Sequence, residues 1–171
     1  MLRADRGWVP AVTDTERAPS TSDAAVFLVC SLASRLCALP LGAVLETMRP
    51  LPLVPFSGAP DFVLGLAVIR GEAVPVVDAG RLAGDRPVRA GRFVTLRAGG
   101  RTAALAVEGV MGLKTMGAAS FAAFPPLLAG DDSGVVRAVA ARDPGLLVVL
   151  DGVRLLPEDT WKQLDAAGAA P

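Results

Sequence analysis

The sequence predicts an all-β fold, a small barrel or sandwich, and three observations support this class. Short apolar runs rich in β-branched residues recur along the chain. Turn signals separate these runs at intervals of roughly ten residues, as in small β domains. Long helical patterns that would alternate with strands, as in an α/β fold, do not occur. The 171 residues suit one domain or two small joined halves, and 52% hydrophobic residues are enough for a core.

The first segment, residues 1–23, is polar and contains Pro, Ser and Thr without periodicity. We expect it to be a mobile tail, with structure beginning at Ala24. It lacks the apolar centre of a signal peptide, and no stretch of the chain approaches the roughly 18 apolar residues that span a bilayer. A soluble cytoplasmic protein is therefore expected.

The next segment reads as a hairpin followed by a helical turn. Residues 24–32 and 35–41 are short apolar runs around a brief connection, which predicts two strands, the second ended by Pro40. Residues 42–50 are expected to form one or two helical turns, which Pro50 closes because the residue before a proline avoids the α region.

The middle of the chain predicts a loop and a second hairpin. Four prolines within 50–60 exclude regular structure there, so we expect an ordered loop. Residues 63–69 and 73–78 are two apolar strands around the polar turn Arg70-Gly71-Glu72, where Gly supplies a positive φ. Pro75 indicates that the second strand is an edge strand or contains a bulge.

A third hairpin follows. Asp78 ends its strand and is expected either to cap the following turn or to make a surface contact. Residues 84–91 are a loop. Residues 92–98 and 101–110 are predicted strands around Gly99-Gly100, a strong two-residue turn signal.

The last third of the chain is expected to close the fold. Residues 110–121 read as a strand-like piece with a loop, and 124–134 as a second ordered loop. Residues 135–142 and 145–151 flank an Asp-Pro turn and predict another hairpin. Residues 157–167 predict a C-terminal helix, because Pro stands at its first turn with two acids after it.

The composition excludes most catalytic chemistry. The chain has no His and no Tyr, which removes Ser-His-Asp catalysis, His metal ligands and a His pH switch. Cys30 and Cys37 are too few for a structural zinc site unless carboxylates join them, so they are expected to be buried hydrophobes or a redox pair across the hairpin. Asp131 and Asp132 read as solvated loop residues. We expect no enzyme activity, metal or cofactor, and at zero net charge no general nucleic-acid binding.

Interaction with other proteins therefore remains, and Arg70 is its sharpest candidate. An arginine at the tip of a rigid turn is either a solvated turn residue or a binding residue, and arginine is enriched among residues that dominate interfaces. Around this turn the chain resembles the CheW family of chemotaxis coupling proteins. Gly65, Arg70 and Gly71 match the G-x-x-x-x-R-G turn of that family, and 74–78 matches its V-P-V-V-D strand end.

Four further segments resemble the same family in the same order along the chain. They are the opening hairpin at 27–41, the V-x-E at 44–46 before the Pro-rich loop, the V-E-G-V at 107–110, and the final strand at 145–156. The resemblance departs from the family pattern in Ala67-Val68-Ile69-Arg70-Gly71, where the family commonly has Asn before Leu-Arg-Gly, and at Ala79, where Leu is common. These departures concern the particular partner more than the fold.

The resemblance implies two packed SH3-like five-stranded β-barrels with short helices and a C-terminal helix, over residues 24–168. It implies a non-enzymatic cytoplasmic adaptor that couples the cytoplasmic tips of methyl-accepting chemotaxis receptors to the regulatory domain of a CheA-type histidine kinase. The monomer would be recruited to membrane-associated receptor arrays. Two alternatives stay open: a CheW-like scaffold or competitor in another signalling or surface-motility pathway, and a β-barrel enzyme or small-ligand carrier.

The resemblance also implies a set of protein-binding residues around a groove between the two barrels. They are Val44, Glu46, Gly65, Arg70, Gly71, Val107, Glu108, Gly109 and Val110. The valines have an alternative role in the core, and the glycines have one in backbone geometry. Glu46 and Arg70 are the strongest candidates, because core packing or backbone geometry explains a polar side chain at these positions less readily than it explains the valines and glycines. We expect Arg70 to fix the register of a receptor helix tip.

Overall fold

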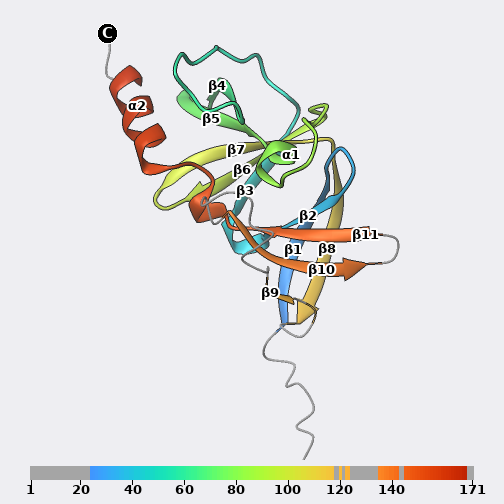
Figure 1. The fold of residues 1–171 in the computed structure, drawn as a ribbon. Helices are drawn as coiled ribbons and strands as arrows, with labels where there is room; N and C mark the ends of the chain where they lie inside the picture. The colour runs from blue at the N-terminus through green and yellow to red at the C-terminus, as the bar shows by residue number, and fades with distance from the viewer. Residues whose placement is uncertain (1–23, 118–119, 121, 124–134, 143–144, 169–171) are drawn as a thin grey trace, which may run out of the picture.

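The computed structural model describes residues 24–117, 120, 122–123, 135–142 and 145–168, and β-structure dominates them. Their strands form two sheets (Figure 1), with the orders β8-β1-β2-β11-β10-β9 and β3-β6-β7-β5-β4. This confirms the predicted all-β class with two SH3-like halves. The first sheet has one strand more than the five expected, because the two-residue β9 extends it.

The bounds of the elements follow the predicted turns closely. The six-stranded sheet contains β1 (Ala24–Ser31), β2 (Leu36–Pro40), β8 (Gly109–Gly117), β9 (Ala122–Ala123), β10 (Val136–Arg142) and β11 (Gly145–Leu150). The five-stranded sheet contains β3 (Val44–Met48), β4 (Val63–Ile69), β5 (Glu72–Asp78), β6 (Arg92–Ala98) and β7 (Arg101–Val107). The helices are α1 (Ala79–Leu82) and α2 (Glu158–Gly168), and the short 3₁₀ turns are η2 (Leu41–Ala43) and η4 (Gly152–Arg154).

The opening hairpin is confirmed, and it places the two cysteines opposite each other. Strands β1 and β2 are antiparallel, with Cys30 facing Cys37, and both side chains are fully buried as free thiols. A hydrogen bond between the thiols lowers the pKa of Cys30, although burial opposes the shift. The same bond, together with burial, raises the pKa of Cys37. The described residues thus hold the cysteines as a buried, adjacent pair.

The predicted helical turns at 42–50 are wrong for most of that segment. Only η2 is helical, and residues from Val44 onward form β3, which pairs antiparallel with β6 from Leu96 to Phe93. Burial alternates along β3, as it does for a strand with one face on the core. The partner strand lies about fifty residues away, so local propensity did not reveal this pairing.

The prediction of an edge strand at Pro75 is also wrong, because β5 lies between β4 and β7. Its parallel ladder to β7 begins only at Val76, so at Pro75 the strand has one ladder neighbour, Leu66 of β4. The residue therefore needs no N–H toward β7. The bulge in this hairpin lies elsewhere, between Val63 and Gly65.

The predicted strand at 101–110 is wrong as a single element. Strand β7 ends at Val107, and β8 begins at Gly109 in the other sheet. Glu108 is the connecting residue, and its N–H donates to the Ser31 carbonyl at 2.9 Å. The apolar pattern runs on through this point, so the sequence concealed that the chain crosses from one sheet to the other.

One core cluster joins the two sheets. Leu39 and Leu150 contribute to it from the six-stranded sheet, and Leu96 and Leu105 from the five-stranded sheet. Trp161 packs into the same cluster from α2, the helix at the upper left of Figure 1. Burying each large aliphatic side chain contributes roughly 1.5–3 kcal/mol, so the shared core binds the two halves to each other.

The ends of the five-stranded sheet are fixed by polar contacts. Asp78, only 1% exposed, caps α1 by accepting from the N–H groups of Gly80 and Arg81 at 2.9 and 3.1 Å, which confirms the capping prediction and excludes the surface contact. Helix α2, also confirmed, is tied to the start of β7 by Arg101, whose guanidinium pairs with Glu158 and Asp165. That guanidinium also lies 5.1 Å from the Trp161 ring centroid.

Several sequence predictions fall outside the described residues. These are the tail at 1–23, the loop at 124–134 with Asp131 and Asp132, and the Asp143-Pro144 turn. The loops predicted at 50–60 and 84–91 contain no helix or extended strand, apart from a single bridge at Val54. No helix within the described ranges is long and apolar enough to cross a membrane.

Candidate functional site

Arg70 occupies a strained backbone position at the tip of the β4–β5 hairpin. Its φ is +53°, and that of Gly71 is +85°, so both central residues of the turn are left-handed. A two-residue turn of this kind favours Asn-Gly, and among the described residues other than glycine Arg70 alone has a positive φ. The predicted need for Gly71 is confirmed. The strain at Arg70 indicates that its side chain matters at this point.

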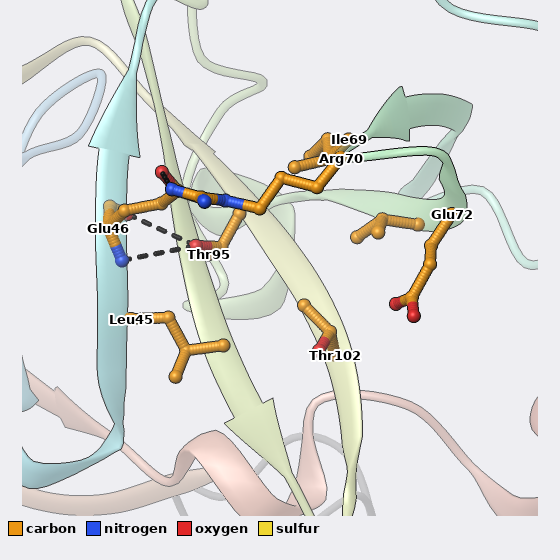
Figure 2. A pocket seen from close by; sticks show the side chains of 8 residues that line it. Leu45, Glu46, Ile69, Arg70, Glu72, Thr95 and Thr102 are labelled. Atoms are coloured by element: carbon orange, nitrogen blue, oxygen red, sulfur yellow. Dashed lines mark hydrogen bonds and ion pairs between the residues drawn. The ribbon is translucent and has the colours of Figure 1, made fainter.

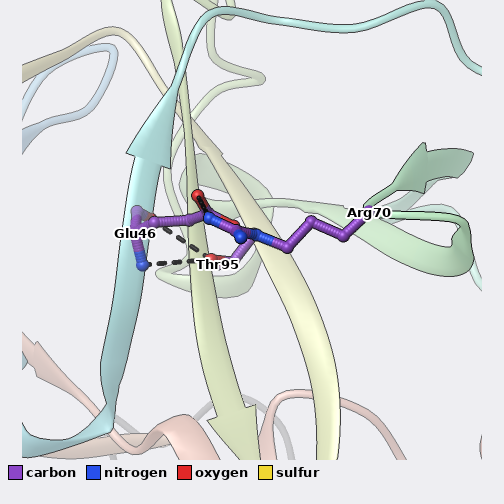
Figure 3. A network of polar contacts seen from close by, with 3 residues as sticks. All are labelled: Glu46, Arg70 and Thr95. Carbon is purple, nitrogen blue, oxygen red and sulfur yellow. Dashed lines mark hydrogen bonds and ion pairs between the residues drawn. The ribbon is translucent and has the colours of Figure 1, made fainter.

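The Arg70 side chain reaches across to Glu46 on β3 (Figure 3). Nε and Nη2 donate to Oε1 and Oε2 of Glu46, each at 2.8 Å, in a bidentate pair. Since β3 and β4 are the two edges of the five-stranded sheet, this pair joins edges that the backbone ladders leave apart. Sequence reasoning selected both residues but did not foresee that they bind each other.

Thr95 of β6 aims Glu46 at the turn. Its buried hydroxyl accepts from the Glu46 N–H at 3.2 Å and donates to the Glu46 carbonyl at 3.3 Å. The β3–β6 ladder changes register between Val44 and Glu46, and a bulge of this kind re-aims the side chain that follows it. Sequence reasoning missed Thr95, because a lone Thr in a strand gives no local signal of such a contact.

The pair is charged and open to solvent. Hydrogen bonds from Arg70 lower the pKa of Glu46, although desolvation opposes the shift. The same bonds raise the pKa of Arg70. The Arg70 side chain is 79% exposed and that of Glu46 is 31% exposed. Two of the five guanidinium N–H groups bind Glu46, which leaves three donors for a partner.

Beside the ion pair lies an open pocket of about 290 Å³ (Figure 2). We call it the ion-pair pocket; its lining residues are Leu45, Glu46, Ile69, Arg70, Glu72, Val74, Thr95 and Thr102. All of them come from the five-stranded sheet and its turn, so this pocket does not lie between the two sheets. Its apolar floor and charged rim suit contact with a protein surface better than catalysis.

Gly65 has a structural explanation of its own. Its φ is +145°, and a Cβ there would lie 2.6 Å from the carbonyl oxygen of Val54. The close approach permits the bridge in which Val54 and Leu66 exchange two backbone hydrogen bonds of 2.8 Å. The Pro-rich loop is thereby held against the edge strand β4.

The V-E-G-V residues lie at the crossing between the sheets. Val107 is fully buried in the shared core, and Val44 is partly buried against the same cluster. Glu108 is exposed, and its carboxylate accepts from the Arg89 N–H at 3.3 Å. Gly109 begins β8 opposite Ser31, and Val110 is partly exposed opposite Cys30.

Strand β8 continues from this crossing with exposed apolar side chains. Met111 is 65% exposed and Leu113 is 61% exposed, and both belong to an edge strand whose sole ladder partner within the described residues is β1. Leu113 faces Leu28 on β1, and Val26 shares that face of the strand. We call Val26, Val110, Met111 and Leu113 the crossover strip. Sequence reasoning found only Val110 of these, because strand periodicity does not say which edge stays uncovered.

Seven of the nine predicted residues form two groups, while Val44 packs against the shared core and Gly65 permits the loop contact at β4. Glu46 and Arg70 line the ion-pair pocket, with Gly71 next to Arg70 in the same turn, while Val107 to Val110 lie at the sheet crossing that leads into the crossover strip. The described part of the chain contains no group of three or more Cys, Asp or Glu side chains that could hold a metal ion.

Comparison with known proteins gives a family and a fold. Residues 26–160 match the family model of the CheW-like domain. Among solved structures, the chain resembles the crystal structure of the scaffolding protein TtCheW from Thermoanaerobacter tengcongensis with a TM-score of 0.64 and 23% sequence identity. The alignment covers 74% of this chain and 88% of that chain, and the likeness shows the fold. No curated protein matches the chain.

Proposed function

The chain belongs to the CheW-like domain family, and we propose that it is a non-enzymatic adaptor in chemosensory signalling. In this role it couples the cytoplasmic tips of methyl-accepting chemotaxis receptors to the regulatory domain of a CheA-type histidine kinase, as a cytoplasmic monomer recruited to receptor arrays. The observation that carries the proposal is the family match over residues 26–160. Residues 24–168 are the functional unit.

Two features of the surface support this role. The crossover strip presents apolar side chains that suit the apolar face of a partner helix. The ion-pair pocket presents a pre-positioned guanidinium with three unused donors. A helix of 20 residues is about 30 Å long, so one receptor helix is long enough to contact both halves of the molecule.

Within this role, the nine predicted residues act differently. Arg70, held by Glu46 and supported by Gly71, fixes the register of the receptor helix. Glu108 and Val110 contact the partner beside the crossover strip, while Val44, Gly65, Val107 and Gly109 shape the backbone and core that present them.

The test is binding of the purified protein to soluble receptor tip fragments and to the kinase regulatory domain from the same genome. We expect the native chain to bind both. Arg70→Ala and Glu46→Ala should weaken binding to the receptor fragment by roughly 30-fold and leave kinase binding unchanged, as expected for an interface hot spot. Arg97→Ala is the matched control, because Arg97 is an exposed arginine of the same sheet outside the pocket.

The outcomes separate the candidate roles. Binding to neither protein would contradict the coupling function and would favour a CheW-like scaffold or competitor in another pathway. Equal loss of receptor binding in Arg97→Ala would show that arginine charge, rather than the Arg70 site, is responsible. Arg70→Lys sharpens the result, because lysine keeps the charge and loses the bidentate geometry.

A further inference from the structure

A loop on the rim of the molecule concentrates positive charge. Arg81 in α1, Arg86 and Arg89 in the following loop, and Arg92 at the start of β6 are all exposed. We call residues 81–92 the arginine loop. The whole chain has zero net charge, so this excess is local. Within the described residues, none of the four guanidinium groups forms a salt bridge.

Asp85 lies within the arginine loop and Glu108 lies beside it, and both carboxylates accept hydrogen bonds from N–H groups of the loop. Asp85 accepts from the N–H and hydroxyl of Ser34 at 2.8 and 2.6 Å and from the Arg86 N–H at 2.8 Å. Glu108 accepts from the Arg89 N–H at 3.3 Å. Arg81 and Arg92 direct their guanidinium groups to main-chain carbonyls, which do not cancel charge.

The arginine loop is held in place by contacts with both sheets. The Asp78 carboxylate accepts from the Val88 N–H, and the Gly91 N–H donates to the Val107 carbonyl at 2.9 Å. Ser34, at the tip of the β1–β2 hairpin, anchors Asp85 from the other half of the molecule. The backbone that carries the arginines is fixed in this way, so it loses little conformational entropy when a partner binds.

The same contacts place the arginine loop next to the crossover strip. Its residues 89 and 91 bond to Glu108 and Val107, and Glu108 directly precedes the first residue of β8. Figure 1 shows the start of β8 and the tip of the β1–β2 hairpin meeting this loop. The arginine loop therefore borders the crossing at which β8, the strand that carries most of the crossover strip, begins.

We propose that the arginine loop selects partners whose docking helix carries carboxylates beside its apolar stripe. The inference rests on the proposed function, in which the crossover strip receives a partner helix. Apolar contact on the strip would supply affinity, while the arginines on its rim would speed association and reject partners with basic flanks. Discrete carboxylates suit this loop better than an anionic membrane, because Asp85 and Glu108 stand among the arginines and would be repelled by a continuous negative surface.

The experiment uses the full chain and a soluble receptor tip fragment from the same genome. The variant is Arg86→Gln/Arg89→Gln, whose two side chains are exposed and make no side-chain hydrogen bond within the described ranges. The control is Arg97→Gln/Arg154→Gln, which removes the same charge from exposed positions elsewhere. Association and dissociation rates are measured at about 50 and about 500 mM NaCl, because salt screens such contacts.

The loop variant should bind about tenfold more weakly at low salt, mainly through slower association, and should approach the native chain at high salt. The control should bind like the native chain. A receptor fragment whose flanking Glu and Asp residues are changed to Gln and Asn should bind the native chain and the loop variant equally. Equal binding of the unaltered fragment by loop variant and control at both salts would overturn the inference.

Two further measurements separate this inference from the proposed function. Suppose that the native chain and the loop variant bind the fragment equally well, while Leu113→Lys no longer binds it. The docking role of the crossover strip is then supported, and the proposed charge selection is contradicted. If the native chain does not bind the fragment at either salt concentration, the proposed function is contradicted, and the proposed charge selection is contradicted as well. Loop-dependent binding to phosphatidylserine vesicles, with no loop effect on the fragment, would assign the arginines to a membrane surface instead.

Discussion

The two sheets have similar strand pairing but differ in the contacts that their edge strands make. Each contains antiparallel hairpins joined through one parallel ladder, β2 with β11 and β5 with β7. In the five-stranded sheet, the bidentate Glu46–Arg70 pair joins the edge strands β3 and β4. In the six-stranded sheet, β8 remains an edge strand with exposed apolar side chains. An uncovered edge of this kind tends to pair or pack with another chain.

This difference shows that topology alone does not decide which sheet edges are joined by side chains and which stay exposed. One half of the molecule uses side chains to close its own edges and so presents a fixed charged group. The other half leaves an apolar edge open beside the arginine loop. The shared core keeps the two surfaces at a constant separation, which a rigid adaptor needs if it is to contact two partners.

The strongest test of the comparison is to damage each half of the shared core separately. Leu39→Ala in β2 and Leu105→Ala in β7 each remove a fully buried side chain, and each should lower the free energy of unfolding by about 2–5 kcal/mol. Urea denaturation should give one transition, with circular dichroism and Trp161 fluorescence coinciding in a Trp8→Phe background. Two separate transitions would show that the sheets fold independently and that the core does not couple them.

A smaller loss in the free energy of unfolding is expected at Asp78, where the five-stranded sheet connects to the arginine loop. Asp78→Ala removes a buried acceptor that binds three backbone N–H groups, those of Gly80, Arg81 and Val88. We expect a loss of about 1–3 kcal/mol in the free energy of unfolding. Hydrogen exchange should show faster exchange in 79–91 and little change in β1. Uniformly faster exchange across both sheets would mean that Asp78 supports the whole fold and not this loop.

The exposed side chains of the edge strand β8 should contribute little to stability. Leu113→Ala should change the free energy of unfolding by less than about 0.5 kcal/mol, because the side chain is mostly in solvent already. Leu147→Ala, on buried β11 of the same sheet, is the matched control and should cost about 2–5 kcal/mol. Chemical denaturation measures both. A large loss from Leu113→Ala would indicate that the crossover strip is part of the core and not a docking surface.

The smallest effect concerns the Glu46–Arg70 pair, which joins the edge strands β3 and β4, and its dependence on pH. The pKa of Glu46 lies below its ordinary value of 4.5, so the contribution of the ion pair is present above about pH 4.5 and is lost as pH falls through the folded-state pKa. The difference in Tm between the native chain and Glu46→Gln should therefore shrink on acidification. Glu72→Gln, on the same pocket, is the control. A difference in Tm that persists unchanged at pH 3 would show that the contact between the edge strands β3 and β4 does not depend on the charge of Glu46.

Most strands and turns could be predicted because their signals are local. The apolar runs at 24–32 and 63–69, the Gly99-Gly100 turn and the Pro-started helix at 158–168 all depend on residues next to one another in the chain. Strand β3 could not be predicted in this way, since its conformation depends on pairing with β6 about fifty residues later. The break between β7 and β8 was hidden for a similar reason, because both strands are apolar up to the crossing.

The candidate site was predictable in part. Glu46 and Arg70 were selected from the family resemblance and from the turn, and their binding role stays a prediction. Their mutual contact, its support by Thr95 and the exposure of Met111 and Leu113 became visible only in three dimensions. Exposure is a property of what the rest of the chain leaves uncovered, so no local pattern reports it.

By itself, the sequence determined the all-β class, the positions of the tight turns and the absence of histidine chemistry, because these depend on composition and on neighbouring residues. Only the tertiary structure decided which strands became edges, that one pair of edges is joined by Glu46 and Arg70, and that the arginine loop lies against the start of β8. Those features arise from contacts between residues 19 to 78 positions apart, whose free energy is realised only when the whole chain has folded.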